Sequence, residues 1–273
     1  MKKDIRMVDA ERGVMCVTSE DERFYCRPKN NPKTGIPDSI EWRPSVTWIC
    51  DVGYPKGRGF MNWLKNHGNE SDDIARLAAE RGYKVHRAIA SLNEGNVVGI
   101  DDIFDNGEGQ ESPLTAEEYL AVMSYEQWWS DGACDEYEIL ESERTLWPDA
   151  AACETKYSTP SKYFEFAGTL DLKVRRRSDD TVGIIDMKTS SNIWPSHEMQ
   201  VSAYARAEGA DWQAILQLNY QRNKKQKYKF TLVDDCFDLF CATYTIWQRE
   251  AENMQPLQRD YPLELKLKGL EAA

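Results

Sequence analysis

The chain has 273 residues, 41% of them hydrophobic, and its 34 basic and 46 acidic residues give a net charge of −12. This composition is typical of one large globular domain or two small ones, and no apolar run is long enough to span a bilayer. Affinity for a nucleic-acid backbone comes from lysine and arginine. The acidity therefore argues more strongly against a stable nucleic-acid binder than against an enzyme that must release its substrate.

The N-terminus and the cysteines predict a cytoplasmic protein of a bacterium or a phage-infected host cell, without membrane contact. The first residues, Met1-Lys-Lys-Asp, lack an apolar signal region. The seven cysteines form no Cys-x-x-Cys pair, and their odd number and scattered positions favour reduced thiols over a disulfide framework.

We expect three segments along the chain. Residues 1–42 form an N-terminal extension without a recognisable motif. Residues 43–255 form the main domain, with a mostly helical part at 43–132 and a central sheet with flanking helices at 133–255. The tail, residues 256–273, is uninformative.

Two stretches predict loops. Residues 27–39 are rich in proline, asparagine, lysine and glycine. Residues 95–113 are acidic and contain glycines, but their spacing lacks the terminal glutamate of a calcium-binding loop. A solvated surface loop is therefore the favoured interpretation of the second stretch.

A helix is predicted to begin near residue 45. Pro44 followed by Ser45 and Thr47 is typical of a helix start, with Ser45 as the N-cap. Basic and aromatic side chains of the kind that suit single-stranded nucleic acid lie nearby, namely Lys56, Arg58, Trp48 and Trp63. For the two tryptophans, a place in the hydrophobic core is the favoured interpretation.

Residues 72–93 predict a second helix, because their apolar residues recur at three-and-four spacing. Gly82 and His86 are four residues apart and share a face. A mid-helix glycine costs about 1 kcal/mol relative to alanine, so we expect close packing at Gly82. A helix histidine by itself is usually structural or exposed, so His86 gains meaning only from its context.

A helix and a strand precede the main motif. Thr115-Ala-Glu-Glu is a capping box that opens a helix to about residue 132. Its periodic face contains Tyr119, Val122, Met123, Glu126 and Trp129, and the hydrophobic core is the favoured place for the aromatic residues. Residues 136–147 alternate as a strand does, and Glu143 is a candidate for an additional acidic residue near a metal. An exposed strand face explains Glu143 equally well.

Two strands joined by a turn carry most of the expected chemistry. Residues 182–188 predict a strand on which Asp186 and Lys188 share one face, while Ile185 and Met187 point into the core. Asp171 lies on the preceding strand-like run, and the turn composition between the two runs predicts a hairpin. Two carboxylates suit Mg²⁺ or Mn²⁺, and an ammonium suits the attacking water or the charge of a phosphoryl transition state. A surface hairpin with a salt bridge is the structural alternative.

A helix is predicted from Pro195 to about Gly209. Gln200 and Tyr204 lie one turn apart on it and would face the same cleft. Thr189 and Ser190 follow the lysine directly, and hydroxyl groups beside a phosphate site can donate to phosphate oxygens.

Two further strands, at 212–220 and 228–233, enclose the clearest basic patch of this acidic chain. A DNA-backbone contact and a solvated turn are both compatible with that patch, which contains Arg222, Lys224 and Lys225. Asp234 and Asp235 can then open a last helix.

Together these motifs resemble the RecB-like branch of the PD-(D/E)xK nuclease superfamily. That branch combines Gly-x-x-Asp (168–171 here) and Asp-x-Lys (186–188) with a helical Gln-x-x-x-Tyr (200–204) and an upstream histidine, His86. The resemblance covers roughly residues 43–230. One departure is Leu170, which stands where the family name has proline.

The resemblance implies the fold and the roles of the residues. It implies an α/β, restriction-endonuclease-like fold with a central mixed sheet flanked by helices and an N-terminal helical arch. His86, Asp171 and Asp186 would bind one or two Mg²⁺ or Mn²⁺ ions, and Glu143 best fits the family's extra acidic position. The implied catalytic residues are Asp171, Asp186, Lys188, Gln200 and Tyr204.

Similar Ser-Val-Thr segments open the nuclease domain of phage exonucleases and of the mitochondrial genome maintenance exonuclease, where they touch the DNA backbone. The resemblance thus makes Ser45 and Thr47 candidates for phosphate contact. Some branch members hold an iron–sulfur cluster with three cysteines after the Gln-x-x-x-Tyr motif. Only Cys236 and Cys241 follow it here, so we expect no cluster.

We therefore expect a metal-dependent DNA exonuclease that acts on single-stranded or free ends in recombination, repair or replication, with a recombination or replication protein as its partner. An endonuclease with the same site is the first alternative. A catalytically silent nucleic-acid-binding protein on a nuclease fold is the second, and the full set of Asp, Asp, Lys and His argues against it.

Overall fold

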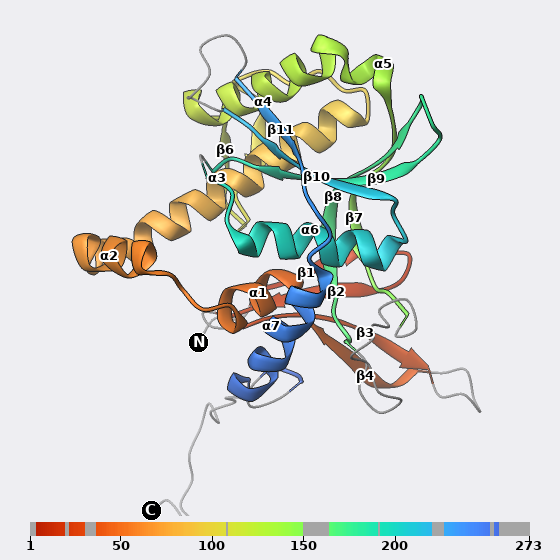
Figure 1. Ribbon diagram of the computed structural model, residues 1–273. Coiled ribbons are helices and arrows are strands. Elements are labelled where there is room, and N and C mark those ends of the chain that lie inside the picture. The colour runs from red at the N-terminus through yellow and green to blue at the C-terminus, as the bar shows by residue number, and fades with distance from the viewer. Residues whose placement is uncertain are drawn as a thin grey trace, which may run out of the picture.

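The computed structural model describes residues 4–19, 22–30, 37–107, 109–149, 164–190, 192–219, 227–251 and 254–256. It shows a mixed α/β protein with a central five-stranded mixed sheet and a separate four-stranded antiparallel sheet, seen below the first in Figure 1. Within these ranges, no helix is both long and apolar enough to cross a membrane.

The central sheet has the strand order β11-β10-β9-β8-β7. The parallel pair β9–β10 lies in the middle, and the neighbouring pairs are antiparallel. β8 and β9 form the predicted hairpin. The strands are β7 (Tyr137–Leu146), β8 (Gly168–Arg176), β9 (Val182–Lys188), β10 (Trp212–Gln217) and β11 (Lys229–Leu232).

Helices cover both faces of this sheet, as Figure 1 shows. One face carries α6 (Pro195–Glu208), against which α1 (Val46–Gly53) and α7 (Phe237–Glu250) pack. The other face carries α3 (Glu70–Asn93) and α4 (Ala116–Trp128). α4 continues through the π-helix η1 (Trp129–Ala133) into α5 (Cys134–Glu136).

Alternation along β9 separates two hydrophobic cores. Ile184 packs with Leu170 in the core under α6, while Ile185 and Met187 belong to the core under α3 and α4. Successive side chains of a strand point to opposite faces, so Asp186 and Lys188 are left on the α6 side. The predicted orientation of this strand is therefore confirmed.

The N-terminal sheet corrects the predicted loop at residues 27–39. Of that stretch, residues 27–30 and 37–39 lie in strands that pair with each other. One cross-strand pair, Arg27 and Glu41, also forms an ion pair at 3.1 Å. Long-range pairing of this kind outweighs the local turn composition. The strands are β1 (Asp4–Asp9), β2 (Val14–Thr18), β3 (Arg23–Asn30) and β4 (Pro37–Pro44).

Two other local expectations also change. The acidic stretch 95–113 contains the short antiparallel pair β5 (Ile103–Asp105) and β6 (Glu111–Pro113). On α4, the buried stripe passes through Tyr125 and Trp128, whereas Met123 is 51% exposed. The predicted helix is present, and Tyr119, Val122 and Trp129 of its expected face do belong to or pack against the core under α3 and α4, so only Met123 departs from the prediction.

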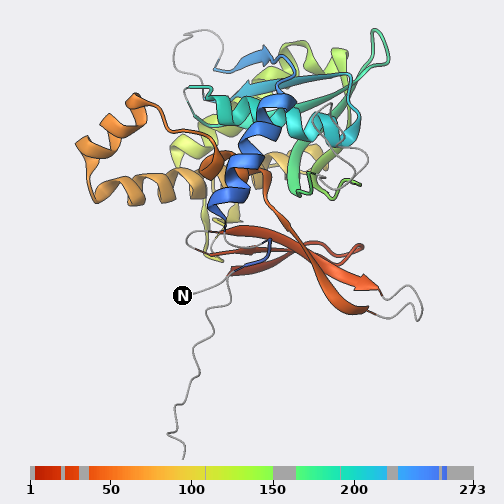
Figure 2. The same cartoon turned by 60° about the horizontal axis from the view of Figure 1, so that its bottom comes forward.

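The two tryptophans of the helical part differ in environment. Trp48 packs against the core under α6 and contacts the rings of Phe24 and Trp247, as expected. Trp63 lies on α2 (Arg58–His67), which has no buried residue and extends away from the body in Figures 1 and 2. Its ring stacks on Phe60 at 5.7 Å between centroids, so the core interpretation of Trp63 is wrong. The arch itself stays a prediction.

The contact between α1 and α7 predicts a stability effect. A Cβ atom added to Gly53 would lie 2.4 Å from the backbone oxygen of Thr243, so Gly53→Ala must push the two helices apart. We expect the free energy of unfolding to fall by about 1–3 kcal/mol in urea denaturation followed by circular dichroism.

Gly59→Ala is the matched control, because a Cβ at that position of α2 meets nothing within 4 Å. Its free energy of unfolding should stay the same or rise by about 0.5 kcal/mol. Equal destabilisation by both substitutions would contradict the packing described for Gly53.

Candidate active site

The β8–β9 hairpin places two buried carboxylates side by side. Leu172, which follows Asp171, is paired with Ile185, which precedes Asp186, and the Asp171 carboxylate is close enough to raise the pKa of Asp186. Asp171 is 6% exposed and Asp186 is 1% exposed. One oxygen of Asp171 accepts the backbone N–H of Met187 at 2.5 Å, which ties the two strands together at this point.

A chain of polar contacts leads from Asp186 to α6. The Lys188 ammonium lies 2.8 Å from Asp186 Oδ2 and donates to Gln200 Oε1 at 3.1 Å. Gln200 in turn donates its Nε2–H to the Tyr204 hydroxyl at 3.2 Å. The structure thus brings together four of the predicted catalytic residues, and α6 holds the lysine in place.

Gly168 makes room for the last member of this chain. A Cβ atom at Gly168 would lie 2.6 Å from Tyr204 Cε1 and 2.9 Å from its hydroxyl. Every other amino acid would therefore displace the tyrosine ring. The glycine of the Gly-x-x-Asp motif and the tyrosine of the Gln-x-x-x-Tyr motif thus form a single packing contact.

His86 reaches the same place from α3. Its Nδ1 lies 3.1 Å from Asp171 Oδ1 and 3.4 Å from Glu143 Oε1. One ligand atom each from His86, Glu143 and Asp171 lies within 4.8 Å of the others, and this is the group among the described residues that could hold a metal ion. The grouping differs from the predicted set because Glu143 takes part and Asp186 is paired with Lys188 instead.

The backbone at Glu143 departs from ordinary strand geometry. Its φ is +51°, a left-handed conformation within β7, two residues after an irregularity in the β7–β8 pairing between Ile139 and Glu141. Non-glycine residues rarely adopt this conformation, and it costs free energy. Its effect here is to bring the carboxylate of an edge-strand residue to His86 and Asp171.

Gly82 lies one turn before His86 on α3. The nearest atom to a Cβ at Gly82 would be Thr189 Oγ1 at 3.8 Å, an ordinary van der Waals distance. The tight packing expected at this glycine is therefore not found. The contact nevertheless shows that α3 passes directly over the residue that follows Lys188.

Burial and mutual proximity perturb the charged groups strongly. Burial raises the pKa of Asp186 to about 6, with the carboxylate of Asp171 adding to the increase and Lys188 opposing it. Burial alone would lower the pKa of His86, but the carboxylates of Asp171 and Glu143 raise it well above its ordinary value. Burial likewise opposes the charge of Lys188, whose pKa is nevertheless raised by Asp186 and Asp171.

These residues suit a divalent cation. Asp186 Oδ1 is buried without a hydrogen-bond partner among the described residues, whereas Asp186 Oδ2 faces the Lys188 ammonium at 2.8 Å and Glu143 Oε1 faces His86 Nδ1 at 3.4 Å. Buried carboxylate oxygens with so few hydrogen bonds are costly, and a hard cation such as Mg²⁺ or Mn²⁺ takes oxygen ligands of this kind. His86 Nδ1 lies 3.1 Å from the Asp171 carboxylate and 3.4 Å from the Glu143 carboxylate, so the three residues could hold one cation together.

The predicted DNA-contact residues have mixed outcomes. Ser45 is fully buried at the start of α1, with its hydroxyl 2.9 Å from that of Thr47, so in this structure it cannot reach a phosphate. Thr47 and Thr189 are half-buried, and the Ser190 hydroxyl donates to the Asn192 carbonyl at 2.9 Å. The basic residues Arg222, Lys224 and Lys225 lie outside the described part of the chain.

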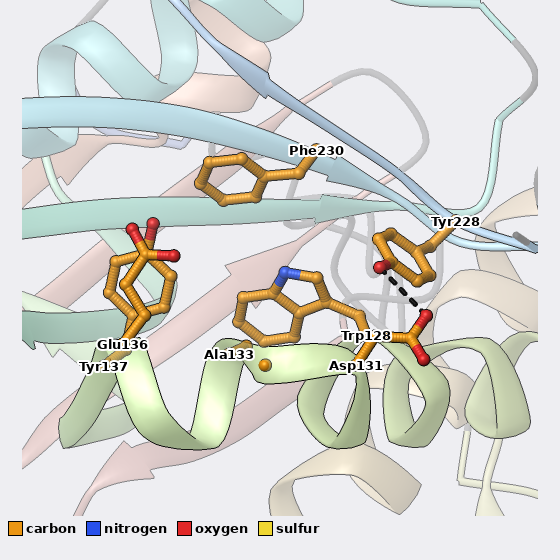
Figure 3. Close-up of a pocket in the computed structure, with 8 residues that line it drawn as sticks. Trp128, Asp131, Ala133, Glu136, Tyr137, Tyr228 and Phe230 are labelled. Carbon is orange, nitrogen blue, oxygen red and sulfur yellow. Dashed lines mark hydrogen bonds between the residues drawn. The ribbon is translucent and has the colours of Figure 1, made fainter.

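A cavity of about 240 Å³ lies elsewhere, between the α4–α5 segment and β11 (Figure 3). Its walls include the rings of Trp128, Tyr137 and Phe230, and the Tyr228 hydroxyl donates to Asp131 at 3.1 Å. Trp128 and Tyr137 belong to the core under α3 and α4. No residue of the candidate active site lines this cavity, so the expected chemistry does not involve it.

Sequence reasoning did not single out His197 or Trp194, which lie at the start of α6. His197 is three residues before Gln200, a spacing that puts both on one face of a helix, and this spacing was the available signal. Trp194 immediately precedes the helix and is 54% exposed.

Comparison with known proteins adds little. No protein-family model and no curated protein matches the chain. Among solved structures, an alkaline exonuclease (LHK-Exo) from Laribacter hongkongensis matches 76% of this chain and 87% of its own length, with 12% sequence identity and a TM-score of 0.37. The structure of SSO0001 matches 46% of this chain, with 12% identity and a TM-score of 0.32. The match spans 55%, about half, of that protein's own length. Likenesses this distant carry no argument, so function must be argued from the geometry of the site.

The cluster on α3, β7 and β8 predicts a role for Glu143 in metal binding. Glu143→Gln removes one charged ligand from the group, so the affinity for Mn²⁺ measured by isothermal titration calorimetry should fall about 10- to 100-fold. The control is Glu141→Gln, two residues away on β7, where the carboxylate pairs with Arg144 instead. An equal loss of affinity in both variants would contradict the proposed ligand group.

Proposed function

We propose that this protein is a divalent-metal-dependent nuclease that hydrolyses phosphodiester bonds of DNA. The observation that carries the proposal is the meeting of a possible metal-binding group, His86, Glu143 and Asp171, with the buried Asp186–Lys188 pair. Two or more carboxylates, a histidine and a lysine at one place are the groups that metal-assisted phosphodiester hydrolysis needs.

Each residue has a role in this proposal. His86, Glu143 and Asp171, with Asp186 beside them, would hold the cation, which would polarise a phosphate oxygen and lower the pKa of a water. The Lys188 ammonium stabilises the negative charge that develops on the phosphate. Gln200 fixes the lysine through the 3.1 Å hydrogen bond, and Tyr204 fixes Gln200.

The motif resemblance to the RecB-like branch of the PD-(D/E)xK superfamily supports the same assignment. Contacts among the motif residues support it: Gly168 packs on Tyr204, Asp171 accepts the backbone N–H of Met187, and Lys188 donates to Gln200. From the resemblance we further propose an exonuclease that acts on single-stranded or free ends in cytoplasmic recombination, repair or replication, together with a recombination or replication protein.

A digestion of end-labelled DNA tests the proposal. Linear single strands, linear duplex and closed circles would be incubated with the wild type and with Asp186→Asn, in Mg²⁺, Mn²⁺ or EDTA. We expect wild type to degrade linear DNA only when a metal is present, and the variant to be inactive. Cleavage of closed circles would show that the enzyme is an endonuclease and not an exonuclease. Absence of cleavage with binding retained would overturn the enzyme and favour a silent binding protein.

Lys188 should affect the rate of cleavage more than the binding of the metal ion. In Lys188→Met, we expect kcat to fall about 100- to 1,000-fold while the affinity for Mn²⁺ stays within a few-fold of wild type. Lys173→Met is the matched control, because that lysine lies on the neighbouring strand and pairs with Glu208 at 2.6 Å. A control variant as slow as Lys188→Met would contradict the role given to Lys188.

A further inference from the structure

α6 presents three polar residues in one line toward the catalytic lysine. His197, Gln200 and Tyr204 have the spacing i, i+3 and i+7, which places them along one face of a helix. The contact of Gln200 with Lys188 shows that this face is turned to the site. His197 lies about 4.5 Å farther along the helix axis than Gln200, toward the helix start. The proposed chemistry uses Gln200 and Tyr204 but leaves His197 without a role.

His197 is set up as a neutral hydrogen-bond donor. Its Nδ1 accepts the backbone N–H of Trp194 over a long 3.4 Å contact, which leaves the proton on Nε2. Burial and the nearby Lys188 ammonium lower the pKa of His197 to about 3, so the imidazole carries no charge. Among the described residues, none accepts a hydrogen bond from Nε2. A donor of this kind beside a phosphate-cleavage site suits a phosphate oxygen.

Trp194, whose backbone N–H bonds to the His197 ring, presents a large aromatic side chain to solvent. It is the only exposed residue among the nine tryptophans of the chain, and the other eight are buried or half-buried. Its backbone is fixed, because its carbonyl accepts the N–H groups of His197 at 2.9 Å and Glu198 at 3.3 Å. The preceding residue, Ile193, packs against the core under α6. An exposed indole on a fixed backbone is a platform on which a nucleobase can stack.

We propose that Trp194 and His197 form a nucleotide subsite beside Lys188, in which the indole stacks on the base next to the cleaved bond and Nε2–H of His197 donates to the adjoining phosphate. The inference rests on the proposed nuclease function and defines its substrate more closely. A base can stack on an indole only after it has left the stack of its own strand, so the bound nucleotide belongs to a single strand or a frayed end.

The test replaces the stacking base and the indole separately and together. Single-stranded oligonucleotides with and without an abasic position beside the labelled cleavage point would be digested by wild type, Trp194→Ala and Trp194→Phe. Removal of the base should lower kcat/KM of the wild type about 10-fold. In Trp194→Ala, kcat/KM should be the same on the intact and the abasic strand. Trp194→Phe keeps a ring and should respond as wild type does. Ile246→Ala, an exposed apolar residue on α7, controls for loss of surface in general.

His197 has a matching readout at the phosphate. A methylphosphonate at the adjoining linkage removes a charged oxygen, so it should slow wild type about 10-fold but should have little further effect on His197→Ala. The subsite would be overturned if both Trp194→Ala and His197→Ala responded to the two modified substrates as strongly as the wild type does.

Binding measurements keep the subsite testable if the nuclease proposal fails. Fluorescence anisotropy of the same oligonucleotides would be measured in EDTA. If wild type cleaves nothing but Trp194→Ala still weakens binding about 10-fold for the intact strand only, then the nuclease proposal is wrong and the subsite stands. If wild type cleaves and all variants bind and cleave alike, the nuclease stands and the subsite is wrong. If wild type neither cleaves nor distinguishes the intact strand from the abasic one in binding, both are wrong.

Discussion

Two carboxylates buried side by side set the main physical constraint on this protein. Asp171 and Asp186 lie close together on the neighbouring strands β8 and β9, almost without exposure to solvent. Like charges in such a place repel each other and lose their hydration, so they require compensation from positive groups or a shared proton. Lys188 and His86 supply that compensation, and they come from β9 and from α3. The arrangement of the surrounding elements can be understood as the means of bringing these four groups together.

The central sheet and its two helical layers each contribute one part. The β8–β9 hairpin fixes the two aspartates and the lysine on one surface. α6 holds the lysine from one side through Gln200 and Tyr204, and the absence of a side chain at Gly168 allows the tyrosine to approach β8. α3 brings His86 from the other side. Polar residues that lock one another in this way give a preorganised site, which electrostatic catalysis requires.

Local sequence patterns predicted the elements that carry the charged motifs. Strict alternation in β9 was enough to place Asp186 and Lys188 opposite Ile185 and Met187. Pro195 and Gly209 were enough to bound α6, because proline favours the first helical position and glycine the left-handed residue after the end. These signals are local, and the structure agrees with them.

Contacts between distant residues were beyond local patterns. The sheet β1–β4 depends on cross-strand pairs such as Arg27 with Glu41, and turn-like composition concealed it. The burial of Ser45 could not be foreseen from its place before a helix, because Ala167 and Arg23 pair with its backbone from other parts of the chain. The left-handed turn at Glu143, which brings this residue rather than Asp186 to His86, leaves no mark in the sequence.

Anomalous X-ray diffraction from a crystal soaked in Mn²⁺ would test the metal-binding role of this cluster most directly. We predict an anomalous peak between Asp171, His86 and Glu143, on the side that faces Asp186 and Lys188. The contrary result is a Mn²⁺ peak elsewhere and none among these residues, in crystals whose protein still cleaves DNA after it is dissolved. That result would contradict the role given to the buried carboxylates.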